Sequence, residues 1–348
     1  MPTIKTRFTE TFATHHPFAQ AGMAFAGEKK ELAIAVSRAG GVGAIGVGFM
    51  PPEILRQTIR EIREAGVEMF NINFITCFGN EDQVKVAAEE KVPVVSFHWG
   101  HPPAHQVSLL KEAGCSLWVQ IGSVADALTA VGYGADVIIA QGQEAGGHNY
   151  QGIGGLNQAG MGGIALIPVI VDAVGDKALV LAAGGIADGR GVAAALALGA
   201  DGVWVGTRLV ASEEAYVHPD HHRRLVEAEG TDTMFSAVFG PEMPFFNPMR
   251  LHKSRVVAEW TDRLAEVPTE RGDLEVIGET VFLGQPHTKR KFDVILPTPE
   301  TSGDLEEMAW LMGQGVGLIK SIRPAAAIVS EMMDEAAAII RSKAQRIS

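Results

Sequence analysis

The sequence has few cysteines and no excess of positive charge. Its only cysteines, Cys77 and Cys115, lie far apart and form no CxxC pair, which predicts a reducing compartment and no zinc site. Lys and Arg number 29 against 41 Asp and Glu, giving a net charge of −12. An acidic chain without basic runs is a poor candidate for binding nucleic acid or an anionic membrane surface.

Long hydrophobic runs are also missing. No apolar stretch approaches the roughly 20 residues that a membrane span needs, because Asp172, Asp176 and Lys177 interrupt the most apolar region. The N-terminal stretch MPTIKTRFTETF lacks a hydrophobic signal core. We therefore expect a cytoplasmic protein of 348 residues, enough for one large domain or two modest ones.

Short apolar segments recur along the chain, and a helix-like stretch follows each. They cover residues 16–22, 41–48, 67–75, 92–100, 116–122, 135–142, 178–186 and 201–207. Near-continuous apolar strands are typical of a parallel sheet that is buried on both faces. Eight such strands alternating with helices predict an α/β fold, a (β/α)8 TIM barrel. A doubly wound open sheet is the alternative.

The alternation stops after Thr207. Residues 209–304 hold the proline-rich stretch GPEMPFFNPMR and a long polar section, and we predict a smaller, mostly helical lobe inserted as a lid or substrate lobe. The HPDHH stretch (218–222) within it is expected to be solvent-exposed. Residues 305–348 end in an amphipathic helix that should pack back on the barrel, so residues 1–208 and 305–348 would form one domain.

The strand ends hold the candidate site residues, because ligands of such barrels bind at the C-terminal ends of the strands. The seventh strand ends at Gly184-Gly185 and the eighth at Gly206-Thr207. Glycines let backbone N–H groups approach an anion, and a following short helix directs its positive end at it. We predict a phosphate site here; turn glycines without a ligand are the alternative.

Two other strand ends suggest room for a flat ring. Asn71 and Asn73 lie on the same side of the third strand, where an inward amide needs hydrogen-bond partners. A flavin-like ring edge would supply them, and a satisfied core amide is the alternative. Ala21 and Gly22, just before Met23, are small and leave space beside such a ring. Met23 is also compatible with simple core packing.

The sixth strand ends in AQGQEAGGHNY (140–150), which places a histidine after a glycine pair. Gln141 and Gln143 flank a glycine at the strand end, and His148 follows Gly146 and Gly147 at the expected barrel mouth. We predict a functional role for His148. Glu144 either orients this histidine or caps the next turn.

A second histidine cluster, HWGHPPAH (98–105), has spacing that superficially resembles metal ligands. Pro102 and Pro103 break any helix that would align the side chains, so no metal site is expected there. His101 remains a candidate to line the pocket at the end of the fourth strand.

A glycine-flanked glutamine precedes the tail helix. Gln314 stands between Gly313 and Gly315, and glycines there would let its amide reach the bound ring or the second lobe. A helix-entry turn is the equally simple alternative.

Together, HPFAQAGMA, FNINFI, AQGQEAGGH, AAGGIADGRGVAAALALGADGVWVGTR and GQGVGLI resemble the nitronate monooxygenases, formerly called 2-nitropropane dioxygenases. The resemblance covers most of the barrel and the tail and is weakest across residues 215–300. The same motifs occur in flavin-dependent enoyl-acyl-carrier-protein reductases and in certain NADH:quinone reductases. FMN is the cofactor that the resemblance implies in all three.

The resemblance also implies site residues. His148 corresponds to the active-site histidine, and the positions that correspond to FMN contacts are Asn73, Gln141, Gly146, Gly185, Trp204, Val205, Gly206 and Thr207. The family often follows the histidine with Arg-Gly or another small residue, whereas this chain has Asn149-Tyr150, which leaves the substrate open.

These expectations lead to an oxidoreductase. The implied reaction is oxidation of an alkyl nitronate, or of a nitroalkane, by O2 to a carbonyl compound and nitrite. His148, as a cation or a hydrogen-bond donor, would hold the nitro oxygens or remove the α-proton. The alternatives are an NAD(P)H-dependent FMN reductase of enoyl thioesters or quinones and a non-enzymatic flavin-binding regulator. The expected partners are a small-molecule substrate and O2, without nucleic acid or membrane, and a homodimer is left open.

Overall fold

Eight parallel strands form a closed barrel in this computed structural model, which describes residues 3–149, 160–270, 272 and 274–346. The neighbour order is β1-β9-β8-β6-β5-β4-β3-β2. Hydrogen bonds from Gln20 N–H to the Val42 carbonyl (2.8 Å) and from Val42 N–H to the Phe18 carbonyl (2.9 Å) join the two ends of the sheet. The predicted TIM barrel is therefore confirmed, and the open sheet is excluded. The barrel strands are β1 (Phe18–Gln20), β2 (Gly43–Gly46), β3 (Phe70–Ile75), β4 (Val94–His98), β5 (Ser116–Ile121), β6 (Val137–Gln141), β8 (Leu179–Ala183) and β9 (Gly202–Val205).

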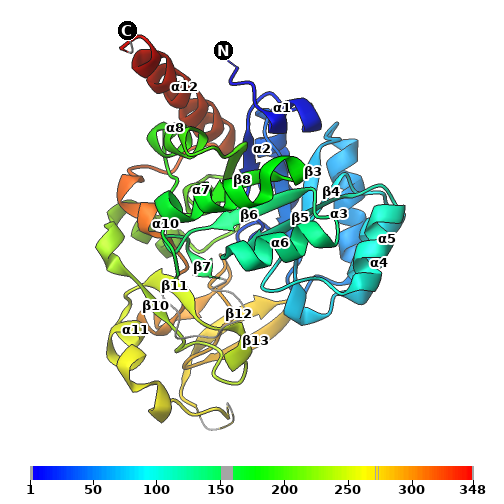
Figure 1. Cartoon of the computed structure of the whole chain (residues 1–348). Helices are drawn as coiled ribbons and strands as arrows, with labels where there is room; N and C mark the ends of the chain where they lie inside the picture. The colour runs from blue at the N-terminus through cyan, green and yellow to red at the C-terminus, as the bar shows by residue number, and fades with distance from the viewer. Residues whose placement is uncertain (1–2, 150–159, 271, 273, 347–348) are drawn as a thin grey trace.

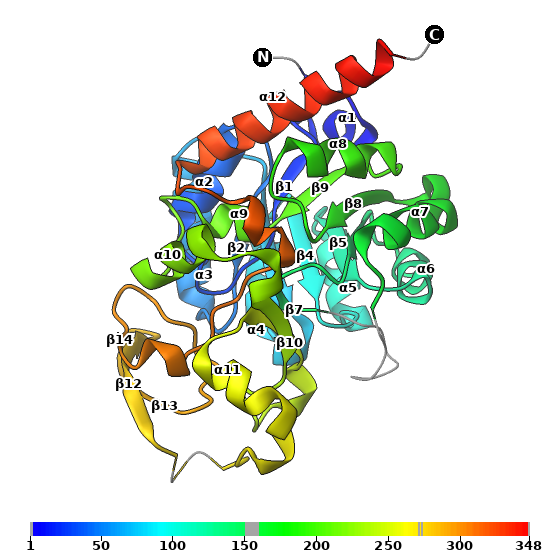
Figure 2. The ribbon, with the colours of Figure 1, turned by 90° about the vertical axis from the view of Figure 1, so that its left-hand side faces the viewer.

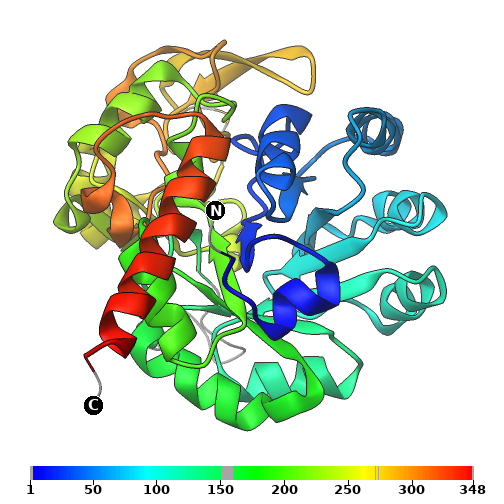
Figure 3. The same ribbon diagram turned by 90° about the horizontal axis from the view of Figure 1, so that it is seen from above.

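Helices surround the barrel, as the view from above shows (Figure 3). Each amphipathic helix buries one apolar stripe; in α3, for example, Leu55, Ile59 and Ile62 are buried at helical spacing. Pro52 begins this helix, where a proline fits without loss of a hydrogen bond. The surrounding helices are α2 (Lys30–Arg38), α3 (Pro52–Glu64), α4 (Glu81–Glu89), α5 (Ala104–Glu112), α6 (Val124–Gly132), α7 (Gly163–Val174) and α8 (Gly189–Ala197).

A short N-terminal helix, α1 (Arg7–Phe12), closes the amino end of the barrel. Phe8 and Phe12 pack edge-on against Trp118 of β5, with ring centroids 5.6 and 5.1 Å apart. Arg7 holds the helix in place through two hydrogen bonds of 2.8 Å to the carboxylate of Asp201. Since aromatic side chains fill this end, the opposite, carboxyl end is where a ligand can enter.

The tail helix α12 (Ala325–Ala344) packs against α8, as Figure 2 shows, so the tail packs on the barrel as predicted. The two helices approach closely at Gly189, the first residue of α8. A Cβ added there would lie 2.5 Å from Cβ of Glu335 and 2.6 Å from the Met332 carbonyl oxygen. Gly189 N–H also donates to the Glu335 carboxylate at 2.7 Å.

Residues 209–304 form a lobe at the other end of the barrel from the two termini (Figure 1). The lobe combines helices and strands, so the prediction that it is mostly helical was wrong. In β12 of the β12–β13 hairpin only Ile277 and Thr280 are buried, three positions apart, and the strand has an irregular register between Val276 and Gly278. The sequence therefore lacks the regular alternation of apolar and polar residues that marks a strand with one buried face. Its main elements are α9 (Thr207–Val210), α10 (Pro219–Glu227), β10 (Thr233–Ser236), β11 (Met249–His252), α11 (Arg255–Trp260), β12 (Val276–Phe282), β13 (Gln285–Arg290) and β14 (Ser302–Gly303).

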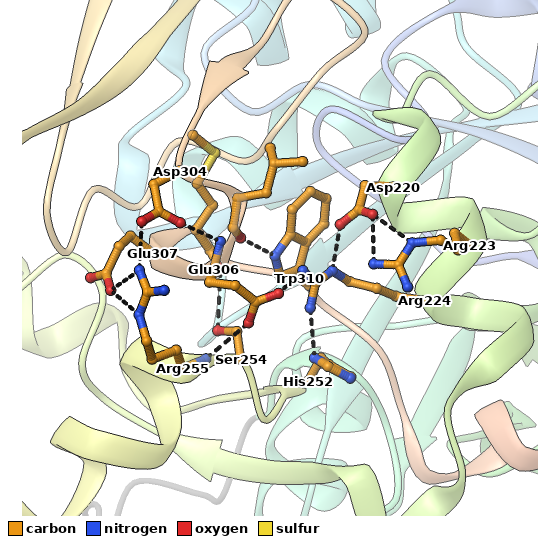
Figure 4. Close-up of polar contacts among 12 residues, drawn as sticks. Asp220, Arg223, Arg224, His252, Ser254, Arg255, Asp304, Glu306, Glu307 and Trp310 are labelled. Atoms are coloured by element: carbon orange, nitrogen blue, oxygen red, sulfur yellow. Dashed lines mark hydrogen bonds and ion pairs between the residues drawn. The ribbon is translucent and has the colours of Figure 1, made fainter.

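A buried arginine ties the lobe to the start of the tail (Figure 4). Arg224 of α10 forms ion pairs with Asp220 (2.6 Å) and with Glu306. Its guanidinium also lies 5.0 Å from the Trp310 ring centroid and donates to His252 Nδ1 at 3.3 Å. Because a buried charge is costly without such partners, this network fixes α10 against β11 and residues 304–310.

No helix within the described part of the chain is long and apolar enough to cross a membrane.

The contact at Gly189 generates a stability prediction. Gly189→Ala should lower the free energy of unfolding by about 1–3 kcal/mol, because the added methyl group overpacks the α8–α12 contact. Gly132→Ala, where an added Cβ meets no atom within 4 Å, is the matched control and should be neutral or slightly stabilising. Urea unfolding of both variants tests this, and equal effects would contradict the close packing.

Candidate active site

A deep pocket lies at the carboxyl ends of the strands, beneath the lobe. Its empty volume, part of which is open to solvent, is about 1510 Å³. The lobe supplies mainly apolar wall residues, including Met243, Phe246 and Met249. The sequence-predicted residues that line the pocket are Ala21, Gly22, Met23, Gln141, Gly146, His148, Gly184, Gly185, Trp204, Gly206 and Thr207.

The ends of β8 and β9 form one corner of this pocket. Gly184 and Gly185 have φ angles of 100° and 73°, a conformation that L-residues rarely adopt. A Cβ on Gly184 would lie 3.0 Å from the Ala145 nitrogen and 3.1 Å from the Gly142 carbonyl oxygen. Because glycines have no side chain, the backbone at the ends of β8 and β9 is exposed at the pocket surface.

The N-terminus of α8 is already occupied by carboxylates. Asp188 accepts hydrogen bonds from the N–H groups of Arg190 (3.0 Å) and Gly191 (3.3 Å), and Glu335 accepts from Gly189. The N-terminal N–H groups of α8 are therefore not free to bind an anion in this corner. An anion there would instead meet the loop that follows β8 and the backbone around Gly206, at the start of α9.

The loop after β6 packs backbone to backbone against the Gly313 segment. A Cβ on Gly146 would lie 2.5 Å from the Gly313 nitrogen, and a Cβ on Gly313 would lie 2.7 Å from the Glu144 carbonyl oxygen. Gln314 N–H donates to that carbonyl at 2.9 Å, and Gly313 N–H donates to Thr207 Oγ1 at 3.0 Å. Three pocket-forming segments are thus joined where no side chain could fit.

Glu144 caps a helix and does not hydrogen-bond His148 in the described contacts. Both of its carboxylate oxygens lie close to the N–H group of Gly163, at 2.9 and 3.0 Å, at the start of α7. A negative charge at a helix N-terminus is stabilising. Of the two roles expected for Glu144, the structure therefore supports capping.

His148 lies in the short strand β7 (Gly147–His148), which pairs antiparallel with β11. Its ring packs against the ring of Phe246 at a tilt of 31°, with centroids 3.5 Å apart, and meets the ring of Trp99 edge-on with centroids 5.6 Å apart. Its backbone carbonyl accepts a hydrogen bond of 3.1 Å from Gln141 Nε2. Its Nε2 atom is buried without a hydrogen-bond partner among the described residues, which leaves it available to a ligand.

The environment of His148 favours a neutral ring. Burial lowers the pKa of His148 well below 6.5, and the nearby His98 lowers that pKa further. Burial also lowers the pKa of His98 to about 4. Because the pKa of His148 is lowered, the cation is disfavoured at neutral pH in the ligand-free protein. The neutral imidazole can donate one hydrogen bond and accept another.

Two expected cofactor contacts lie behind the pocket wall. Asn73 packs beneath Gly22, where an added Cβ would lie 2.3 Å from Asn73 Oδ1, and its Nδ2 donates to Ser96 Oγ at 2.7 Å. The side chain of Val205 belongs to the core between the barrel and its outer helices. Neither residue is part of the pocket lining, because neighbouring residues already surround both side chains.

The two candidate substrate residues also lie elsewhere. His101 Nδ1 is 2.9 Å from the hydroxyl of Tyr133, which ends α6, and its Nε2 is 3.5 Å from the carboxylate of Asp126 in that helix. This histidine therefore packs against α6, outside the pocket. The side chain of Gln314 is exposed, and only the backbone of this residue makes the contact described above. Tyr150 lies outside the described residues, while Asn149 donates to the Gly142 carbonyl at 3.1 Å.

Several pocket residues were missed or misjudged from the sequence. His98 and Gln120 line the pocket from β4 and β5, and the lobe adds Phe246. His221, in a stretch expected to be exposed, is buried and lines the pocket, with Nε2 3.0 Å from the Leu311 carbonyl oxygen. Its spacing of four residues from buried Leu225 is the helical signal that could have placed it inward.

Buried His221 generates a pH prediction. Burial lowers the pKa of His221 from 6.5 to about 4, so the unfolded chain binds a proton in this range that the folded chain does not. The stability contributed by neutral His221 should be lost as the pH falls from 6.5 toward 4, by up to about 1.4 kcal/mol per pH unit. Denaturant unfolding of wild type and His221→Gln across this range measures it. A wild-type-minus-variant difference that is independent of pH would contradict the assignment.

A pocket at the carboxyl ends of the strands is where enzymes of the TIM-barrel fold have their active sites. No group of three or more metal-ligating side chains occurs in the described ranges. The model of the family described as nitronate monooxygenase matches residues 5–78 and 71–335. This chain belongs to the nitronate monooxygenase family. It is accordingly a flavin-dependent oxidoreductase that acts on small substrates.

Related sequences and structures agree with this assignment. A probable nitronate monooxygenase of Bacillus subtilis is 34% identical over 67% of this chain and 76% of that protein. One from Staphylococcus aureus is 32% identical over 69% and 77%, respectively.

Two solved structures share the whole architecture. FabK from Thermotoga maritima has a TM-score of 0.80 and 34% identity, covering 99% of this chain and 100% of that one. The nitroalkane oxidase from Streptomyces ansochromogenes has a TM-score of 0.77 and 25% identity, covering 96% and 99%.

Proposed function

We propose that this protein is an FMN-dependent nitronate monooxygenase, which oxidises alkyl nitronates with O2 to carbonyl compounds and nitrite. The observation that carries the proposal is the buried Nε2 of a neutral His148, which has no hydrogen-bond partner among the described residues and lies in a mainly apolar pocket. Relatives named as probable nitronate monooxygenases and a neighbour described as a nitroalkane oxidase support the substrate class.

The pocket residues fit FMN. The positive φ angles and missing side chains of Gly184 and Gly185 form a cradle that a Cβ would fill, and backbone N–H groups are suited to a phosphate. This loop and Gly206-Thr207 would hold the phosphate, while Met23 and Gln141 line the space for the ring. FMN bound there would supply the redox chemistry for oxidation of the substrate by O2.

His148 would hold the reacting group. A neutral imidazole can donate to a nitro oxygen of a nitronate, or its unprotonated nitrogen can accept the α-proton of a neutral nitroalkane. A bound anion favours the protonated ring, so the pKa of His148 should rise when a nitronate binds. The lobe would act as a lid, because Phe246 covers the histidine ring and keeps water from it.

The alternative is an NAD(P)H-dependent FMN reductase of enoyl thioesters or quinones. It rests on the motifs shared with those enzymes. The two reactions differ in what reduces the flavin, which makes them separable in solution.

A test of the function combines a substrate panel with a variant of His148. With alkyl nitronates under air, wild type should consume O2 and release nitrite. His148→Asn should retain FMN but lower kcat/KM by about 10²–10⁴, the contribution of one positioned acid–base group. The loss should be larger for neutral nitroalkanes, which also need deprotonation.

The control is anaerobic mixing of wild type with NADPH. Rapid flavin reduction by NADPH, together with no oxygen uptake on any nitronate, would replace the proposed function with the reductase. Full activity of His148→Asn on both substrate forms would remove His148 from the mechanism.

A further inference from the structure

A second cavity adjoins the active-site pocket and shares part of its wall. Its empty volume is about 1530 Å³, part of which is open to solvent. Ala24, Phe25 and Phe49 line both cavities, so these residues form the partition between them. The cavity lies between the loop after β2 and the tip of the β12–β13 hairpin.

Aromatic side chains run continuously from the catalytic histidine to this cavity. The ring centroid of Phe246, which packs against His148, lies 5.0 Å from that of Phe78, and the Phe78 centroid lies 4.6 Å from that of Phe49. Phe49 then contacts Phe282 of the hairpin at 5.5 Å. The apolar surface of the active site therefore extends beyond the space that a short nitronate would need.

The far side of the second cavity is apolar where it is open to solvent. Val281 and Leu283 of the hairpin are 44% and 53% exposed, and Ile54 of α3 is 50% exposed. All three line the cavity. Grouped apolar side chains that remain exposed usually mark a ligand or partner site, and this group is continuous with the substrate pocket.

The charged side chains that line the cavity come from residues 28–31 and from Glu61 of α3, none comes from the hairpin, and four of the five are paired. Lys30 lies 2.6 Å from Glu61, and Lys29 lies 3.6 Å from Glu28. A charged ligand group would have to compete with these pairs, whereas an uncharged hydrocarbon chain needs only the apolar wall. The chemistry of the cavity therefore favours an alkyl chain.

We infer that the second cavity is a subsite for the unbranched alkyl tail of the substrate, with Phe49 as the gate between the tail and the reacting group. The inference rests on the proposed function for the identity of the reacting group. It predicts a preference for long-chain over short-chain substrates, because each buried methylene group increases affinity by about threefold to fourfold.

The test uses the holoenzyme and a variant of the hairpin. Val281→Asp places a charge in the subsite, and Val276→Asp places the same charge on the same strand, at an exposed residue that lines neither cavity. The ratio of kcat/KM for 1-nitrodecane to that for nitroethane, both as nitronates, is measured for each protein. Wild type and Val276→Asp should favour the long chain by at least about a hundredfold, and Val281→Asp should lose most of that ratio.

A binding measurement separates this inference from the proposed function. Decanoate and butyrate are planar anions that resemble nitronates without their reactivity, and calorimetry gives their affinities directly. Tighter binding of decanoate that Val281→Asp abolishes supports the subsite even if no nitronate is oxidised. Equal affinity for both carboxylates, or equal loss in the two Asp variants, overturns the subsite while leaving nitronate oxidation intact.

Discussion

The active site depends on backbone segments that touch without side chains between them. Gly146 and Gly313 approach so closely that a Cβ on either would overlap the other segment. This contact joins the loop after β6, the start of the tail and, through Thr207 Oγ1, the end of β9. Because His148 follows directly in β7 and pairs with β11, its position over the pocket follows from the same contact.

The second determinant is the exclusion of water from the histidines. The lobe places Phe246 on the His148 ring, and burial lowers the pKa of His98 and of His221 to about 4. The lobe can do this because the Arg224 network fixes it on the tail segment. The neutral imidazole of His148 is thus a consequence of how the lobe is attached, since desolvation penalises the charged form.

The barrel was predictable because its strands are buried on both faces and are therefore mainly apolar, as in residues 137–141, a pattern that each strand shows in its own sequence. The position of Gly184 and Gly185 at the end of a strand, on the pocket surface, was also predictable, because that strand is recognisable from its own sequence. Asn73 and His101 were not, since their partners, Ser96 and Tyr133, come from other strands and helices. The hairpin of the lobe was missed because β12 buries only Ile277 and Thr280, three positions apart, and so shows no regular apolar alternation in the sequence.

The central claim is that the glycine corner at the ends of β8 and β9 holds the phosphate of FMN. The most direct measurement is titration of flavin-free protein with FMN and with riboflavin, which has the same ring without the phosphate. Charge-assisted hydrogen bonds contribute about 1.5–3 kcal/mol each, so two of them predict that FMN binds on the order of a hundredfold more tightly or better. Gly185→Val should abolish this preference. Equal affinity of wild type for the two flavins would contradict the claim.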